Sequence, residues 1–176
     1  YMAFHMCSRN HPDYYAFDML SDMLSSGRSS RFVQHLVQDK QIFNSIDAYI
    51  SGSIDNGLFH IVGKPAPEKT LEEAEKAIWE ELALLTEGSI DENELEKVKN
   101  RYESEQIFNN LNYLNVATNL AYFELIGKAE DINTEVEKCR SVTQEQIKRA
   151  AKQTFLPENC SVLYYKAAAK DASHTP

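Results

Sequence analysis

The chain has 176 residues and a mass of 20.1 kDa, which is enough for one domain with its own hydrophobic core. Its 27 acidic and 18 basic residues give a formal charge of −9, and the dispersed basic residues argue against nucleic acid as a partner. No apolar run approaches the roughly 20 residues that cross a bilayer, so we expect no membrane partner either.

The first part of the chain is predicted to be a strand followed by a helix. Residues 1–7 alternate as a strand does, and a chain that opens within a strand is expected to be a piece of something longer. Asn10 and Pro12 favour a helix start, and apolar residues between Phe17 and Leu24 recur at steps of three and four. Gly27 is predicted to end this helix because glycine tolerates left-handed backbone.

A second short helix and a β-hairpin are predicted next. Apolar residues between Phe32 and Val37 fall on one side of a helix. Residues 42–50 and 57–62 then show the period of two that is typical of strands, and Asp55-Asn56-Gly57 supplies the turn between them. Pro65 marks the end of the hairpin.

Capping boxes predict the starts of three later helices. In each, a hydroxyl side chain precedes a Glu or Gln by three residues, so that side chains can satisfy free amides at the helix start. After the second box the helical pattern runs from about residue 92 to 125, and we expect a break at residues 109–115 because asparagine is a poor helix former. The boxes are Thr70 with Glu73, Ser89 with Glu92, and Thr143 with Gln146.

These elements together predict an α+β fold, with a mixed or antiparallel sheet covered by helices on one face. Residues 160–166 form the expected closing strand after Pro157. We expect one domain over residues 1–166 and a disordered tail over residues 167–176.

The sequence contains no complete catalytic or metal-binding set. None of the five histidines has a neighbour at the spacing of H-E-x-x-H or H-x-x-E-H, which leaves His5 and His11 as a weak metal pair. Gly27 to Arg31 lacks the glycine spacing of a nucleophile elbow and the ending of a phosphate loop, so it reads as a turn between helices.

The cysteines and the acidic residues have structural interpretations. The cysteines form no CxxC pair and are predicted to be buried thiols, which suit a reducing compartment. The glutamates that follow Thr70 are predicted to lie on a solvated helix face. The residues concerned are Cys7, Cys139 and Cys160, and Glu72, Glu73, Glu75, Glu80 and Glu81.

The order of several segments resembles the C-terminal domain of insulinase-type zinc peptidases, a family that includes pitrilysin and the mitochondrial processing peptidase. The segments are GRSSR at residues 27–31, the region of Leu36 and Lys40, Gly57-Leu58-Phe59, and ELEKVKNRYES at residues 94–104. The resemblance extends over residues 1–166. It implies a domain that binds no zinc, is inactive alone and helps to wall a peptide-binding chamber. Zinc and a glutamate base would come from an N-terminal domain, which is therefore an expected partner together with the peptide substrate.

In that family, the domain that faces the zinc site usually supplies an Arg and a Tyr seven residues apart. An ungapped alignment places Val37 and Asn44 at these positions, and neither offers a cation or a phenol. We therefore assign no catalytic, metal-binding or substrate-binding residue to this chain, and whether the whole protein is an enzyme stays open.

Two interpretations of Val37 and Asn44 remain. In the preferred one, the chain belongs to a bacterial zinc-carrying subunit, and a second subunit bears the Arg/Tyr pair. In the alternative, it is a structural or dimerisation module of a peptidase-like core protein, as in the respiratory cytochrome bc complex. The expected compartment is the cytoplasm or the periplasm, and the unpaired cysteines favour the cytoplasm.

Overall fold

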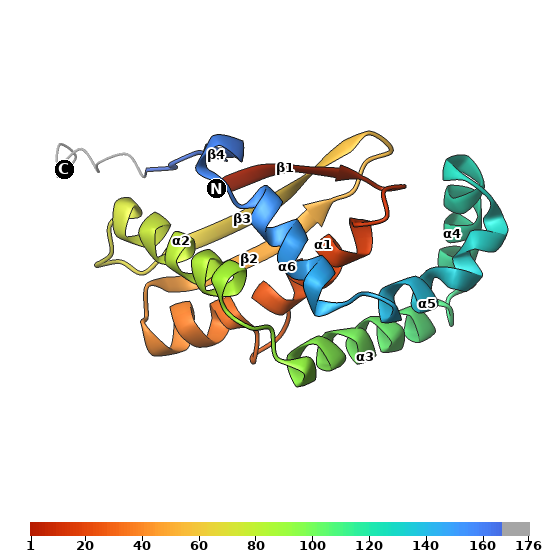
Figure 1. Ribbon diagram of the computed structural model, residues 1–176, viewed down its shortest axis with the longest axis horizontal. Coiled ribbons are helices and arrows are strands. Elements are labelled where there is room, and N and C mark those ends of the chain that lie inside the picture. Colours follow the sequence, from red (N-terminus) through yellow and green to blue (C-terminus); the bar gives the residue numbers. More distant parts are fainter. Residues whose placement is uncertain (167–176) are drawn as a thin grey trace, which may run out of the picture.

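The computed structural model describes residues 1–166 as a sheet with helices packed against one of its faces (Figure 1). The predicted α+β fold is confirmed. The elements follow one another as β1 (Met2–Ser8), α1 (Tyr14–Ser25), η1 (Phe32–Asp39), β2 (Phe43–Ser51), β3 (Asn56–Pro65), α2 (Leu71–Glu87), α3 (Glu92–Asn109), α4 (Tyr113–Ile126), η2 (Ala129–Thr134), α5 (Glu135–Arg140), α6 (Gln144–Thr154), η3 (Pro157–Asn159) and β4 (Cys160–Val162).

The sheet is antiparallel throughout and has the strand order β2-β3-β1-β4. The predicted hairpin forms the pair of long strands β2 and β3, in which Ala48 of β2 lies opposite Ile61 of β3. Ile61 lies in turn opposite Met2 of β1, so three apolar side chains of neighbouring strands share one face. Side chains alternate between the two faces of a strand, and this register therefore buries one face while leaving the other free.

Helices α1, α2 and α6 pack against the buried face. Phe4 of β1 and Phe59 of β3 each meet Phe155 edge to face, with ring centroids 5.1 Å apart in both pairs. Leu20 and Met23 of α1 are fully buried against the same face, as the apolar spacing of this helix predicts. This continuous core holds the sheet and its helices in fixed positions.

Helices α3 and α4 extend the structure beyond the sheet. The predicted break in the long helical pattern is confirmed, since α3 ends at Asn109 and α4 begins at Tyr113. Asn112 caps the second helix by accepting a hydrogen bond of 2.9 Å from the backbone amide of Leu114. In Figure 1, α4 stands at one end of the molecule, away from the sheet. Over residues 1–166, no helix combines the length and the apolarity needed to cross a bilayer.

Two of the three predicted capping boxes form, those of Thr70 with Glu73 and Thr143 with Gln146. The prediction for Ser89 and Glu92 was wrong: Asp91 caps α3 by accepting from the amide of Asn93 at 3.1 Å. A carboxylate next to the helix start meets the free amides directly, whereas Ser89 lies too far upstream.

Three further boundaries differ from the prediction. Helix α1 begins at Tyr14, after a turn in which His11 accepts from the amide of Asp13, so Asn10 is not its cap. The closing strand β4 ends at Val162 instead of extending to residue 166. The tail predicted for residues 167–176 lies outside the described residues.

Candidate functional site

The segment Gly27–Arg31 fixes the corner between α1 and η1. Gly27 has a φ of +86°, which glycine adopts without strain. Arg31 holds Glu94 of α3 with two charge-assisted hydrogen bonds of 2.8 Å, and Lys97 donates to the hydroxyl of Ser29 at 2.7 Å. These contacts fix the turn between α1 and η1 against α3, so the segment Gly27–Arg31 has a structural role.

Val37 and Asn44 flank the passage from η1 to the edge strand β2. Val37 is half-buried against the core, whereas Asn44 is exposed near the start of β2. Val37 belongs to η1, a π-helical segment that ends with the amide of Lys40 donating to the carbonyl of His35 at 3.0 Å. Side chains at these two positions cannot offer a positive charge or a phenol to a peptide.

The face of the sheet opposite the helices carries a polar and aromatic surface. Tyr49 of β2 stacks on His60 of β3 with ring centroids 4.9 Å apart, and His60 lies 3.0 Å from the hydroxyl of Ser51. His5 of β1 and Asp47 of β2 are exposed on the same face. We call these five residues the open sheet face: Tyr49, His60, Ser51, His5 and Asp47.

Within residues 1–166, no three His, Cys, Asp or Glu side chains come together as metal ligands. His5 lies on the open sheet face, while His11 lies in the turn before α1 beside Asp13. A catalytic zinc site needs three protein ligands around one point. The described residues therefore do not fit the zinc that the family resemblance implies, and no chemical step is derived for this chain through a metal.

The three cysteines are free thiols in the structure. Burial raises the pKa of Cys139 to about 12 and that of Cys7 and Cys160 to about 11. The thiolate is the nucleophilic form of cysteine, and at these pKa values the three thiols are mostly protonated at neutral pH.

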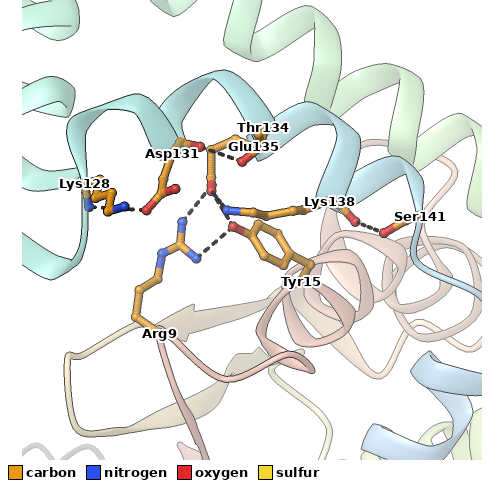
Figure 2. Close-up of polar contacts among 8 residues, drawn as sticks. All are labelled: Arg9, Tyr15, Lys128, Asp131, Thr134, Glu135, Lys138 and Ser141. Atoms are coloured by element: carbon orange, nitrogen blue, oxygen red, sulfur yellow. Dashed lines mark hydrogen bonds and ion pairs between the residues drawn. The ribbon is translucent and has the colours of Figure 1, made fainter. Parts of the chain in front are cut away.

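A buried ion-pair cluster joins the end of β1 to α5 (Figure 2). The guanidinium of Arg9 donates to Glu135 at 2.7 Å, and both side chains are almost fully buried. Tyr15 of α1 donates its hydroxyl to the other oxygen of Glu135, and Lys138 lies 3.5 Å from that oxygen. Arg9 also packs over the ring of Tyr14, at 4.4 Å from its centroid.

Hollows of about 410 and 270 Å³ flank this cluster, and Arg9, Tyr15 and Glu135 line both of them. Burial, with the hydrogen bond to Glu135, raises the pKa of Tyr15, so it remains a neutral donor. The polar groups of the cluster satisfy one another, which makes it a structural clamp between α1 and α5. The sequence offered no signal for it, because Arg9 and Glu135 are 126 residues apart.

One glutamate of α2 departs from the sequence prediction. Glu81 was predicted to lie on a solvated helix face, but it is buried, with 1% of its surface exposed. Its carboxylate lies 2.9 Å from the ring of His35 in η1. Its other oxygen has no hydrogen-bond partner among the described residues. The contact ties α2 to η1, close to Val37.

Comparison with known proteins identifies the family of this chain. The model of the peptidase M16 inactive domain matches residues 1–102, which is more than half of the chain. The chain is 26% identical over 147 residues to YmxG, an uncharacterized zinc protease of Bacillus subtilis, in an alignment that covers 82% of this chain and 36% of YmxG.

Solved structures share the fold at low identity. A protease from Helicobacter pylori matches with a TM-score of 0.84 and 22% identity, over 90% of this chain and 38% of that one. The peptidase M16 inactive domain from Pseudomonas fluorescens matches with a TM-score of 0.79 and 16% identity, over the same two shares.

The chain thus spans little more than a third of the Bacillus protein and of both these structures. The resemblance to insulinase-type zinc peptidases that the sequence suggested is confirmed by the family match. This chain belongs to the M16 peptidase family, as its non-catalytic, inactive domain.

Proposed function

We propose that residues 1–166 form one domain that walls the peptide-binding chamber of an M16 zinc peptidase, while another domain holds the zinc. The observation that carries the proposal is the match to the inactive domain of this family. In this arrangement the other domain supplies the zinc-activated water.

The open sheet face is the surface that would meet the peptide. Helices cover the opposite face, so this is the side of the sheet on which polar and aromatic side chains remain accessible. An extended peptide offers alternating side chains and unpaired backbone groups, and the edge strand β2 offers matching free backbone positions. The stacked Tyr49 and His60 provide a flat contact for such a chain.

The residues at positions 37 and 44, Val37 and Asn44, indicate which partners this domain needs. Because these positions lack a cation and a phenol, we propose that the Arg/Tyr pair that clamps the substrate is supplied by a second subunit. The N-terminal zinc-carrying domain of the same polypeptide is then the direct neighbour of this one. The three free thiols suit a reducing compartment, which favours the cytoplasm.

Hydrolysis of an unstructured peptide tests the proposal. The 176-residue chain should show no cleavage with or without added zinc. The natural polypeptide that carries it, purified with any bound subunit, should contain zinc and cleave the peptide. A chelator should abolish this activity, and added zinc should restore it.

Cleavage by the 176-residue chain alone would refute the proposal, as would a natural polypeptide that binds no zinc. Tyr49→Ala adds a test of the open sheet face: it should raise KM several-fold with little change in kcat, because it removes a binding contact remote from the metal. Leu84→Ala, on exposed α2 surface, is the matched control and should leave both constants unchanged.

A further inference from the structure

The hairpin formed by the end of α3 and by α4 exposes large apolar side chains to an unusual degree. Tyr113 is 91% exposed and Leu111 is 74% exposed. Monomeric soluble proteins rarely leave so many neighbouring apolar side chains in water. We call this set the hairpin surface; its members are Ile107, Phe108, Leu111, Tyr113, Leu114 and Leu125.

The backbone that carries the hairpin surface is ordered by local hydrogen bonds. Asn112 caps α4, and the amide of Leu111 donates to the carbonyl of Phe108 at 3.2 Å in the turn before it. Within α4, Phe123 is the one buried residue, so this helix is held by few core contacts. Its main neighbour in the chain is η2, and in Figure 1 it stands apart from the sheet.

The chemistry of the hairpin surface excludes several kinds of partner. Residues 106–123 contain no Asp, Glu, Lys or Arg, although 26% of the whole chain is charged. Helices that lie on membranes need basic residues beside their apolar face, and nucleic acids need a basic patch. Residues 106–123 provide neither, and the net charge of −9 repels nucleic acids and anionic membranes. The surface therefore fits the apolar surface of another protein.

The same composition indicates a permanent partner. Transient interfaces are about as polar as the rest of a protein surface, whereas permanent interfaces are more hydrophobic and resemble a protein core in composition. An uncharged helix exposed between encounters would promote aggregation. A stable interface takes on the order of 800 Å² from each side, and six large side chains that are each more than half exposed supply a substantial part of such an area.

We infer that the hairpin surface docks permanently on the zinc-carrying domain of the same polypeptide. This rests on the proposed function, and the length of the relatives supports it. This chain spans 36% of the Bacillus protein and 38% of the Helicobacter protease, so most of each relative is a further part that can cover such a surface. The open sheet face then stays free for the peptide.

Site-specific photo-crosslinking in the natural polypeptide tests this inference. p-Benzoylphenylalanine replaces Tyr113 in one variant and Leu84 of α2, which is 57% exposed, in the control. After irradiation and digestion, mass spectrometry should link position 113 to residues outside 1–176, within the part that binds zinc. Position 84 should give no such link.

Three results overturn the inference: links from position 113 to a second copy of residues 1–176, links to a different protein, or no links at all. The zinc content of the same preparation separates the two proposals. A zinc-free polypeptide contradicts the proposed function, whereas a zinc-bound one without these links contradicts the docking alone.

Substitution supplies a second measurement. Leu111→Asp with Leu114→Asp should leave the Tm of the 176-residue chain nearly unchanged, because both side chains are already in water. In the natural polypeptide the same pair should lower Tm by several degrees. Leu84→Asp should change neither, and an equally small effect of the pair in the natural polypeptide would contradict docking.

Discussion

Asp18 of α1 has a carboxyl group whose pKa is strongly raised. Burial is the largest cause and the nearby charge of Asp22 the second, and together they raise its pKa to about 7. Arg9 opposes this rise, while Glu135 and Glu105 add to it. The hydroxyl-rich hollow beside the Arg9 cluster contains this carboxyl, and Arg9, which also lines the hollow, is paired with Glu135.

Asp18 should therefore make the stability of the chain depend on pH. A carboxyl whose pKa is higher in the folded state binds its proton more tightly there, so stability falls as pH rises from about 4 to about 7. Asp18→Asn removes this loss and should stabilise the chain by roughly 2 to 3 kcal/mol more at pH 8 than at pH 5. Urea unfolding at the two pH values measures it, and a gain that is equal at both would contradict the assignment.

Single residues also show where sequence reasoning ends. Glu81 lies beside the apolar stripe of its helix, where a glutamate is normally in water, and its burial depends on His35, 46 residues earlier. The clamp of Arg9 and Glu135 likewise needs the complete fold. By contrast, Val37 and Asn44 could be judged from residue type alone, because no packing turns them into a cation and a phenol.

At the scale of elements, local chemistry determined most boundaries. The apolar period of α1, the capping box that starts α2 and the turn between β2 and β3 were predicted because each of these signals is confined to a few neighbouring residues. The short elements η2 and α5 were not predicted, since six residues are too few for a periodic pattern. They depend on packing against α3 and α4.

The start of α3 offers a direct test of which side chain caps a helix. Asp91→Ala should destabilise the chain by about 1 kcal/mol, because it leaves the amide of Asn93 without its acceptor. Ser89→Ala should cost less than about 0.5 kcal/mol, as for ordinary surface positions. Chemical denaturation of both variants measures the difference, and the reverse order would restore the capping box first predicted for Ser89.

At the scale of the whole molecule, the core is confined to one side of the structure. The buried face of the sheet, α1 and α6 share one continuous cluster, whereas the hairpin of α3 and α4 adds few residues to it. Regions with few buried contacts open without unfolding the rest of a protein. Sequence patterns predicted that α4 is a helix, but its isolation is a property of the tertiary structure.

This uneven core should be visible in hydrogen exchange of the 176-residue chain. Amides of α4 should exchange at least ~100-fold faster than those of β3 and α1, since α4 buries only Phe123 whereas the central strand opens with global unfolding. In the natural polypeptide, exchange in α4 should slow while that of β3 stays the same, because docking covers the hairpin surface. Equal protection of α4 and β3 in the 176-residue chain would mean that α4 belongs to the main cooperative unit, with no need of a further domain to hold it.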